Sequence, residues 1–334
     1  MKILHLGKKG NVEKYLPYKE CLEGVELVDL PITASVEEIL EKASDAQYLI
    51  ADAIAPVPAQ LIRGMSGLKM IHSEGVAYNL FDIEAAKECG VYVCNCKGMN
   101  AMAVAEQTVL LMLCLLRDVT AGDAAVRQGR QIQMKEGYMV RGDLFELSDL
   151  PVGLIGFGDI AKCVAKLMQA FHVKTYYYSH HRADRETEEE YAVTYLPLDE
   201  LCAKCKIFSI HVPVTEETKN MINESFFHKV SLGSYLINTA RGEIVDSQAL
   251  VDAIRKGIIK KAALDTIAGE PVKEDNILIN QPPEIADKLL FSPHIGGITA
   301  SSFKRGYEMV WEDIHAVEAG RKPARVVSDF TDKR

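Results

Sequence analysis

The segment from Val152 to Ala161, VGLIGFGDIA, contains residues whose types and spacing can bind a phosphate. Gly156, Gly158 and Ala161 fit the pattern G-x-G-x-x-G/A. The first glycine permits a tight turn, and the second lets a pyrophosphate approach the backbone N–H groups at a helix N-terminus. A small third residue allows the helix to pack closely on its strand. The pattern therefore predicts a dinucleotide-binding turn.

The residues around these glycines provide the strand and the helix that such a turn requires. Val152–Ile155 has the apolar character of a buried strand, and Ile160–Ala170 has the periodicity of a helix. The glycines thus lie at a strand-to-helix junction, which is the context that gives the motif its meaning. Asp159 and Ile160, at the start of the helix, are expected to lie beside the cofactor.

The stretch that follows the next strand lacks the acidic residue expected of an NAD site. An acid about 20 positions after the glycines usually holds the ribose 2′-hydroxyl. Here the sequence contains Ser179, His180, His181 and Arg182 instead. Serine can donate to a phosphate oxygen, arginine can form a charge-assisted pair, and either histidine can assist. The stretch favours NADP over NAD, although use of both cofactors and a plain solvated loop remain open alternatives.

Polar side chains suited to redox chemistry follow three further apolar segments. Arg241 comes after SYLINTA, Asp265 ends AALD with Glu270 five residues later, and His294 follows LLFSP. Ligands of doubly wound folds bind beyond the carboxyl ends of the strands. These side chains are therefore expected to converge on the nicotinamide of a bound dinucleotide.

The elements that must position these residues alternate along the chain. Short apolar strands are separated by amphipathic helices, which indicates parallel sheets with crossover helices. We expect an α/β protein with two doubly wound parallel-sheet domains, one formed by residues 1–99 and 298–334 and the other by residues 100–297. A long helix from Asn100 to Val119 would leave the first domain, and a final helix from about Thr299 to Ala319 would return to it. Two such crossings predict a hinged cleft.

The composition limits the function classes. The chain has 334 residues, of which 48% are hydrophobic and 25% charged, as in ordinary soluble proteins. A net charge of −9 argues against nucleic acid or an anionic membrane as a partner. The longest apolar run, Val109–Leu116, is too short to span a bilayer. Eight cysteines in a chain of this length form no disulfide scaffold or metal motif, so we expect a cytoplasmic protein without a metal.

Seven segments, in order along nearly the whole chain, resemble the D-isomer-specific 2-hydroxyacid dehydrogenase family, and in particular its glyoxylate/hydroxypyruvate reductase-like members. They are GVAYNLFDIEAA, NAMAVAEQTVLLML, GLIGFGDIA, HVPVTEETKNMIN, NTARGEIVD, ALDTIAGEP and SPHIGG. Each segment alone is a weak signal, but their order and spacing make the match specific. The resemblance implies a flavodoxin-like substrate domain and a Rossmann dinucleotide-binding domain.

The resemblance also implies three catalytic roles. Arg241 would bind the substrate carboxylate and carbonyl, His294 would be the acid/base, and Glu270 would pair with that histidine. These residue types suit the reduction of a 2-keto acid, because hydride transfer to the carbonyl carbon builds negative charge on its oxygen. An arginine can neutralise the carboxylate and polarise the carbonyl, and a glutamate favours the protonated imidazole that must donate a proton.

Further contacts are implied by the same resemblance. Those expected at the cofactor are Val212 and Pro213 through their backbones, Thr239 and Ala240 along the ring, Asp265 at the nicotinamide end, and Gly296 and Gly297 after the histidine. Those expected at the substrate are the backbone N–H groups of Gly75, Val76 and Ala77, which can cradle an anion, and Asn100 at the hinge helix. The family usually has a second glycine where Ala77 stands, so this chain departs from the pattern there.

The expected substrate is a small or apolar 2-keto acid, such as glyoxylate, hydroxypyruvate or pyruvate. The loop ADAIAPVPAQ has no lysine or arginine to bind a phosphorylated substrate, which disfavours 3-phosphoglycerate. Formate dehydrogenases of this fold are disfavoured because resemblance gives them glutamine in place of Glu270. A non-enzymatic, dinucleotide-sensing binding protein of the same fold is the alternative function. We also expect a homodimer, because the family uses the region of GRQIQMKEGYMVRGDLFELSD to cross to a second subunit.

Overall fold

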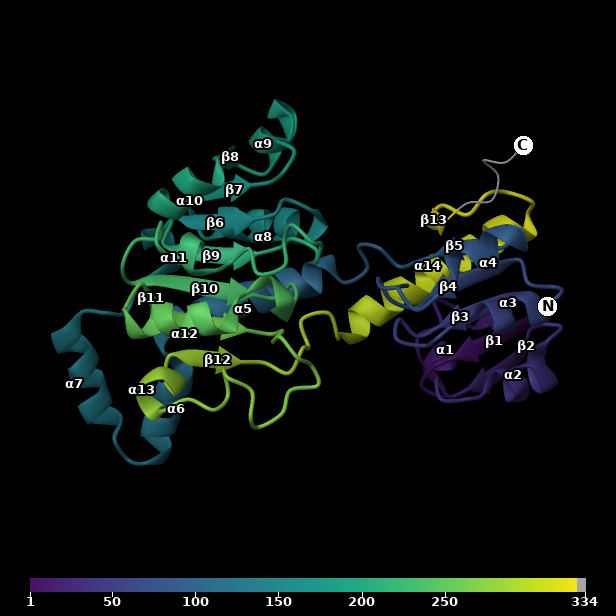
Figure 1. The fold of residues 1–334 in the computed structure, drawn as a ribbon, viewed down its shortest axis with the longest axis horizontal. Coiled ribbons are helices and arrows are strands. Elements are labelled where there is room, and N and C mark those ends of the chain that lie inside the picture. The colour runs from purple at the N-terminus through teal and green to yellow at the C-terminus, as the bar shows by residue number, and fades with distance from the viewer. Residues whose placement is uncertain (329–334) are drawn as a thin grey trace. The chain divides into compact units, whose positions relative to one another are not determined.

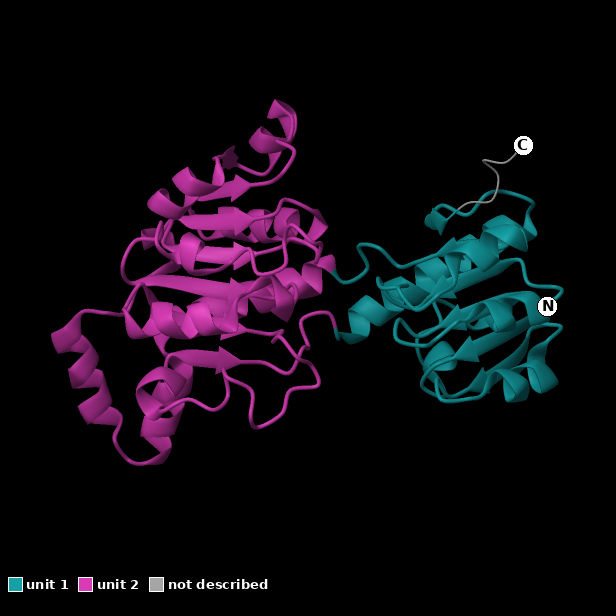
Figure 2. Ribbon diagram, viewed as in Figure 1, with its two compact units in different colours: residues 1–100, 298–334 teal, residues 101–297 magenta. Residues whose placement is uncertain are grey.

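The computed structural model describes residues 1–328 and divides the chain into two compact units (Figure 2). Unit 1 contains Met1–Asn100 and the chain from Ile298 onward, and unit 2 contains Ala101–Gly297. Residues 329–334, which belong to the predicted first domain, lie outside the described residues. Asn100 was expected to begin the second domain but ends unit 1, because the turn before it bonds within that unit through Cys96 and Arg305.

Unit 1 is an α/β layer structure around a six-stranded sheet (Figure 1). Its strands are β1 (Lys2–Leu6), β2 (Glu26–Leu30), β3 (Tyr48–Ala51), β4 (Met70–Ser73), β5 (Tyr92–Cys94) and β13 (Val326–Ser328). Its helices are α1 (Asn11–Lys14), the 3₁₀ turn η1 (Lys19–Leu22), α2 (Val36–Ala43), α3 (Ala59–Gly64), α4 (Ile83–Glu88) and α14 (Ala300–Glu318).

The strand order of this sheet is β13-β5-β4-β3-β1-β2. Strands β1 to β5 are parallel in the flavodoxin-like order 2-1-3-4-5, as the family resemblance implies. β13 adds an antiparallel edge strand beside β5, which the sequence analysis did not anticipate. Helix α14 returns to this unit as expected, and its Tyr307 and Trp311 pack into a core with Ile3 and Ile50.

Unit 2 is built on a seven-stranded parallel sheet. Its strands are β6 (Val152–Ile155), β7 (Thr175–Tyr178), β8 (Val193–Tyr195), β9 (Ile207–Ile210), β10 (Ser234–Asn238), β11 (Ile259–Leu264) and β12 (Leu289–Phe291). Its helical elements are α5 (Ala101–Arg117), α6 (Val119–Arg127), α7 (Gln131–Arg141), η2 (Leu147–Asp149), α8 (Asp159–Ala170), α9 (Arg185–Glu190), α10 (Leu198–Lys204), α11 (Glu224–Phe227), η3 (Gly242–Ile244), α12 (Ser247–Arg255) and α13 (Pro283–Ala286).

The strand order β12-β11-β10-β9-β6-β7-β8 is that of a doubly wound dinucleotide-binding sheet. The direction of winding reverses between β6 and β9, which are neighbours in the sheet. In such folds the crevice beyond the carboxyl ends of the strands at this switch point is where ligands bind. The turn after β6 contains the two glycines of the sequence motif, so the topology brings that motif to the expected position.

Two helices of unit 2 differ in their surroundings. α5 is mostly buried, and its Val109 and Met112 pack with Val164 and Ala165 of α8 in one core. α7 stands apart from the sheet in Figure 1, and none of its residues, all of which are described, is buried.

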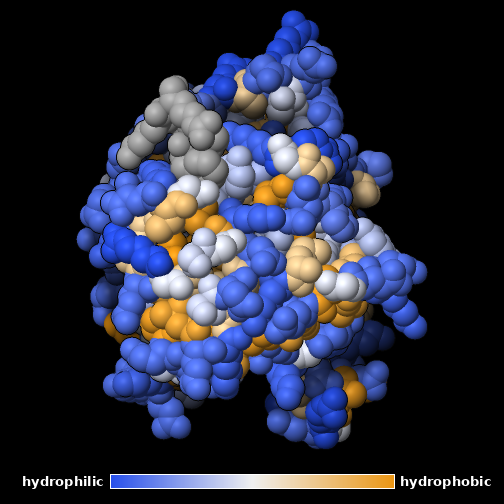
Figure 3. All heavy atoms as spheres, turned by 90° about the vertical axis from the view of Figure 1, so that its right-hand side faces the viewer, coloured by the Kyte–Doolittle hydropathy of each residue, from blue (hydrophilic) through white to orange (hydrophobic). Residues whose placement is uncertain are grey.

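Hydrophilic side chains cover most of the face shown in Figure 3, with smaller groups of hydrophobic side chains between them. Within residues 1–328, no helix is both long and apolar enough to cross a membrane.

Candidate functional site

The turn after β6 is shaped to receive a phosphate. Gly156 has φ +98°, and a Cβ on it would lie 2.7 Å from the backbone of His211, so a side chain there would collide with the loop after β9. Helix α8 begins after Gly158 without a side-chain cap, and a Cβ on Gly158 would enter open space. The first N–H groups of a helix have no acceptor within the helix, so this open end presents hydrogen-bond donors and the positive end of the helix dipole. The residues present fit a dinucleotide pyrophosphate.

The loop after β9 faces this turn. The N–H of His211 donates to the carbonyl of Ile155 over 2.7 Å, and its Nε2 lies 2.8 Å from Ser209 Oγ. Burial lowers the pKa of His211 to about 3, so the imidazole is neutral near pH 7. Val212 and Pro213 follow directly, and Pro213 is exposed. His211 therefore shapes the loop through its backbone N–H and its bond to Ser209.

Arg182 is paired with a carboxylate in the structure. Its Nε and Nη2 donate to Oε1 and Oε2 of Glu188 on α9, each over 2.8 Å. The Tyr177 hydroxyl donates to the same carboxylate over 2.8 Å and accepts from the N–H of Ala183. The guanidinium also lies 5.5 Å from the ring centre of Tyr195. Arg182 is therefore not a free cation, which the sequence analysis did not foresee.

The other residues of this stretch are more open. His180 and His181 are exposed, with their ring centres 5.9 Å apart, and Ser179 is half-buried. All three follow the carboxyl end of β7, the strand beside β6. Residues 178–182 contain no carboxylate of their own, but the fold brings the carboxylate of Glu188 against Arg182.

His294 and Glu270 form a hydrogen-bonded pair in unit 2. His294 Nδ1 lies 2.7 Å from Glu270 Oε2, and the other carboxylate oxygen accepts from the N–H of Ile267 over 2.9 Å. The His294 side chain is 47% exposed, and its Nε2 bonds to no group among the described residues. His294 has φ +55°, a left-handed conformation that a loop residue adopts only where its surroundings hold it. The imidazole is thus fixed at one nitrogen and accessible at the other.

Asp265 holds the loop that contains this histidine. Its Oδ1 accepts from the N–H of Ile295 over 3.0 Å and from the Ser292 hydroxyl, and its Oδ2 accepts from the N–H of Gly296 over 2.8 Å. The Asp265 side chain is buried, and a Cβ on Gly296 would lie 2.9 Å from it. Asp265 therefore positions the segment from Ser292 to Gly296, whereas Gly297 accepts or donates no such bond within residues 1–328.

Arg241 lies on an exposed loop beyond β10. Arg241 Nη1 donates to the carbonyl of Ala240 over 2.7 Å. No carboxylate among the described residues pairs with the Arg241 guanidinium. The buried amide of Asn238 fixes the loop, because it donates to the carbonyl of Arg241 and accepts from the N–H of Ala240. Thr239 is buried, and its hydroxyl lies 2.8 Å from that of Thr108 on α5.

Gly242 brings the Arg241 loop against the Glu270 loop. A Cβ on Gly242 would lie 2.0 Å from both the Ala268 nitrogen and the Ile267 carbonyl carbon, so only glycine fits. Ile267 is the residue whose N–H binds Glu270. The loops after β10, β11 and β12 are therefore interlocked, and they bring Arg241, Glu270 and His294 to the same end of the sheet. The sequence analysis did not single out Gly242, Asn238 or Ser292, although the Arg-Gly pair of NTARGEIVD was a signal for the first.

The predicted substrate loop, Gly75–Ala77, lies in unit 1 after β4. Its three carbonyls accept hydrogen bonds from Ser73, Asn95 and Cys96. The N–H of Gly75 donates to Ser73 Oγ over 3.2 Å, whereas those of Val76 and Ala77 have no acceptor among the described residues. Two of the three expected donors are thus available to an anion. Asn100, at the end of the unit, is half-buried and makes no side-chain hydrogen bond within residues 1–328.

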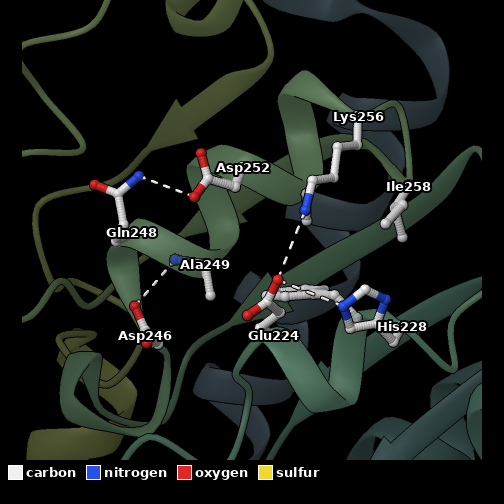
Figure 4. A pocket seen from close by; sticks show the side chains of 10 residues that line it. Glu224, His228, Asp246, Gln248, Ala249, Asp252, Lys256 and Ile258 are labelled. Atoms are coloured by element: carbon white, nitrogen blue, oxygen red, sulfur yellow. Dashed lines mark hydrogen bonds and ion pairs between the residues drawn. The ribbon is translucent and has the colours of Figure 1, made fainter.

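A hollow of about 160 Å³ lies elsewhere in unit 2, between α11 and α12 (Figure 4). Glu224, His228 and Lys256 form an ion-pair cluster at one side of it. None of the predicted site residues lines this hollow. Within residues 1–328, no group of three or more His, Cys, Asp or Glu residues could hold a metal ion.

Comparison with known proteins agrees with this geometry. Residues 109–296 match the family model described as the NAD binding domain of D-isomer specific 2-hydroxyacid dehydrogenases. A glyoxylate reductase from Thermofilum pendens is 35% identical over 313 residues, which cover 93% of this chain and 89% of that enzyme.

Two solved structures extend the comparison. The structure of D-lactate dehydrogenase with NAD+ from Lactobacillus jensenii is 26% identical, with a TM-score of 0.80 over 98% of this chain and 100% of that one. The D-mandelate dehydrogenase of Rhodotorula graminis, 24% identical with a TM-score of 0.84 over 98% of this chain and 97% of that one, shares the fold. The chain belongs to the D-isomer specific 2-hydroxyacid dehydrogenase family.

Proposed function

We propose that this dehydrogenase reduces a small 2-keto acid, such as glyoxylate, hydroxypyruvate or pyruvate, to a D-2-hydroxy acid, with NADPH as the preferred cofactor. The observation that carries this proposal is the His294–Glu270 pair, held at one end of a dinucleotide-binding sheet by loops that also bring Arg241 there. The glyoxylate reductases among the relatives support a small keto acid as the substrate.

The proposed roles follow from the hydrogen-bonding groups that each side chain leaves available for a ligand. Arg241 has an exposed guanidinium with no carboxylate partner, so it can bind the substrate carboxylate and polarise the carbonyl. His294 has Nε2 free and donates a proton to the carbonyl oxygen as negative charge develops there. Glu270 orients the imidazole through its hydrogen bond to Nδ1. A bound nicotinamide dinucleotide supplies the hydride.

Unit 2 is the proposed dinucleotide-binding domain. The open N-terminus of α8 supports binding of the pyrophosphate by Gly156, Gly158, Asp159 and Ile160. The proposed contacts to the rest of the cofactor are Val212, Pro213, Thr239, Ala240, Asp265, Gly296 and Gly297. Ser179, His180, His181 and Arg182 are proposed to receive a 2′-phosphate, and the absence of a carboxylate in their stretch supports NADPH. NADH is proposed as a second cofactor, since Arg182 is paired with Glu188.

Unit 1 is the proposed substrate domain. The free N–H groups of Val76 and Ala77 support the proposal that the Gly75–Ala77 loop binds the substrate carboxylate. Asn100, where unit 1 ends, is proposed as a further substrate contact.

We further propose a cytoplasmic homodimer. All eight cysteines, which lie within the described residues, are free, as is usual in a reducing compartment. Exposed apolar side chains on α6 and α7 support a subunit interface there. They are Val119, Val126, Ile132, Met139 and Val140, of which Val140 is 88% exposed.

A panel of 2-keto acids, each assayed with NADPH and with NADH, tests the proposed function. Turnover of at least one small 2-keto acid, with a higher kcat/KM for NADPH, is expected. A protein that binds dinucleotide but turns over none of these acids would instead be a non-enzymatic, dinucleotide-sensing protein of the same fold.

A further inference from the structure

We infer that Glu188 limits the discrimination between NADPH and NADH by competing with the 2′-phosphate for Arg182. Glu188 would then be a specificity-determining residue, although it lies outside the stretch that the dinucleotide motif singles out. The inference rests on the proposed 2′-phosphate site at residues 179–182.

The contact between the two side chains is specific. Both carboxylate oxygens of Glu188 accept from the guanidinium fork of Arg182, each over 2.8 Å. The Glu188 side chain is 12% exposed, whereas that of Arg182 is 62% exposed. The Tyr177 hydroxyl, itself an acceptor for the Ala183 N–H, donates to Glu188 and fixes it from the other side. The carboxylate is thus held in place, and the arginine is the solvent-facing partner.

Charge explains why this pair matters for the cofactor. The hydrogen bonds from Arg182 hold the pKa of Glu188 below its ordinary value, so the carboxylate is ionised near neutral pH. Arg182 retains three N–H donors for a phosphate, but the pair has almost no net charge. A phosphate monoester dianion is attracted less to a neutral pair than to a free guanidinium. Glu188 therefore weakens the 2′-phosphate contact whether or not the phosphate displaces it.

The same helix contains a matched comparison. Glu189 follows directly and pairs with Arg185 instead, over 2.7 Å, with both side chains largely exposed. Replacing Glu189 removes the same formal charge from α9 without freeing Arg182. A difference between the two positions therefore reports the Arg182 contact and not the general charge of the helix.

Glu188→Gln tests the inference, because glutamine keeps an acceptor for Tyr177 and removes the charge that holds Arg182. Calorimetry with NADP+, NAD+ and the probe adenosine 2′-phosphate measures binding without turnover. We expect the Kd for NADP+ and for the probe to fall about two- to fivefold, the range of exposed ion-pair energies, with NAD+ unchanged. The gain should shrink as salt concentration rises. Glu189→Gln should leave all three constants unchanged.

Arg182→Ala separates failure of this inference from failure of the proposed cofactor site. If Arg182→Ala weakens NADP+ but Glu188→Gln does not strengthen it, Glu188 does not compete and the inference is wrong. If Arg182→Ala leaves NADP+ binding unchanged, the 2′-phosphate does not meet Arg182 at all, and the proposed site is wrong as well. Equal changes for NAD+ and NADP+ in Glu188→Gln, at an unaltered unfolding temperature, would also contradict competition.

Discussion

Single residues of the proposed site divide into accessible ones that do chemistry and buried ones that position them. Arg241 and His294 are exposed, as they must be if a substrate is to reach them. Asn238 and Asp265 are buried, and their polar atoms form hydrogen bonds with the backbone of the loops that contain the exposed residues. Buried polar groups with satisfied hydrogen bonds fix a loop more firmly than exposed ones.

Arg241→Ala should raise the KM for the keto acid and lower kcat, because the guanidinium acts in both the ground state and the transition state. Loss of a hydrogen bond to a charged group costs about 1.5–3 kcal/mol, so kcat/KM should fall roughly ten- to a hundredfold. Steady-state kinetics at saturating cofactor measure both constants. Arg255→Ala, which removes an exposed arginine paired with Asp252 on α12, is the control and should change neither. Unchanged kinetics in Arg241→Ala would remove that residue from the site.

The sequence predicts site residues that belong to recognisable motifs, but it does not predict a contact such as that of Glu188 with Arg182. The two motif glycines, Arg241 and the Glu270–His294 pair follow from spacing or resemblance. Glu188 could not be predicted, because it lies in RETEEE, where each acid has the same local pattern and only the fold selects the one that meets Arg182. A long-range partner of this kind leaves no periodic signal in the sequence.

At the scale of elements, the interlocked loops after β10 and β11 depend on one glycine. Gly242→Ala should separate the Arg241 loop from the Ile267–Ala268 peptide, since its Cβ would lie 2.0 Å from that backbone. Overpacking typically costs about 1–3 kcal/mol, and we expect the upper end or more here because no flexible side chain can move aside. The unfolding temperature and kcat should both fall.

Gly122→Ala is the matched control for this variant. Gly122 lies in α6, and a Cβ there would meet nothing within 4 Å. Alanine in a helix is favoured over glycine by up to about 1 kcal/mol, so stability should be equal or slightly higher. A Gly242→Ala enzyme as stable and active as Gly122→Ala would show that the close packing does not hold the site together.

The long final helix is predictable from sequence, whereas two of the short strands are not. The final helix was expected from about Thr299 to Ala319. It is α14 (Ala300–Glu318), with Thr299 as its N-cap and Ala319 as its C-cap. Strands β8 and β13 were not anticipated: each has three residues, too few to show alternation, and neither is apolar throughout like the equally short β12. The region after α5 was expected to be an arm and forms α6 and α7, whose exposed apolar residues give no clear amphipathic pattern within one chain.

At the scale of the whole molecule, a buried cluster in unit 1 is expected to make stability depend on pH. His5 is fully buried and lies 2.8 Å from Asp29 and 3.3 Å from Glu74, which also accepts from the Tyr307 hydroxyl. Burial by itself lowers the pKa of His5, but Glu74 and then Asp29 outweigh it and raise the pKa above its ordinary value of 6.5. Asp52 adds a further carboxylate near Glu74.

His5→Gln should therefore destabilise the protein most at low pH. A raised folded-state pKa gives stability that is fully present below about pH 6.5 and is lost as pH rises through the folded-state value. Breaking a buried pair costs about 3–5 kcal/mol, which is the loss we expect near pH 6. The difference in unfolding temperature between parent and variant should shrink as the pH rises above 6.5. His315→Gln, on the exposed side of α14, should match the parent throughout. A gap between parent and His5→Gln that stays constant with pH would contradict the account.

The proposed dimer is the second property of the whole molecule. Light scattering at micromolar concentration should give twice the mass of the chain, and Met139→Glu combined with Val140→Glu should give a monomer, because charges would then be buried at the interface. Leu232→Glu is the control, since Leu232 is 70% exposed but lies outside α6 and α7. A parent protein that is monomeric at this concentration would refute the dimer.

The proton donor is the central element of the proposed chemistry, and His294→Ala tests it most directly. The measurement is the rate of NADPH oxidation with the best keto acid of the panel, together with the calorimetric Kd for NADP+. We predict that turnover falls roughly 10²-fold or more while cofactor affinity is retained, because the imidazole donates a proton and does not hold the dinucleotide. Near-parental turnover in His294→Ala, at unchanged cofactor affinity, would contradict the proposed mechanism.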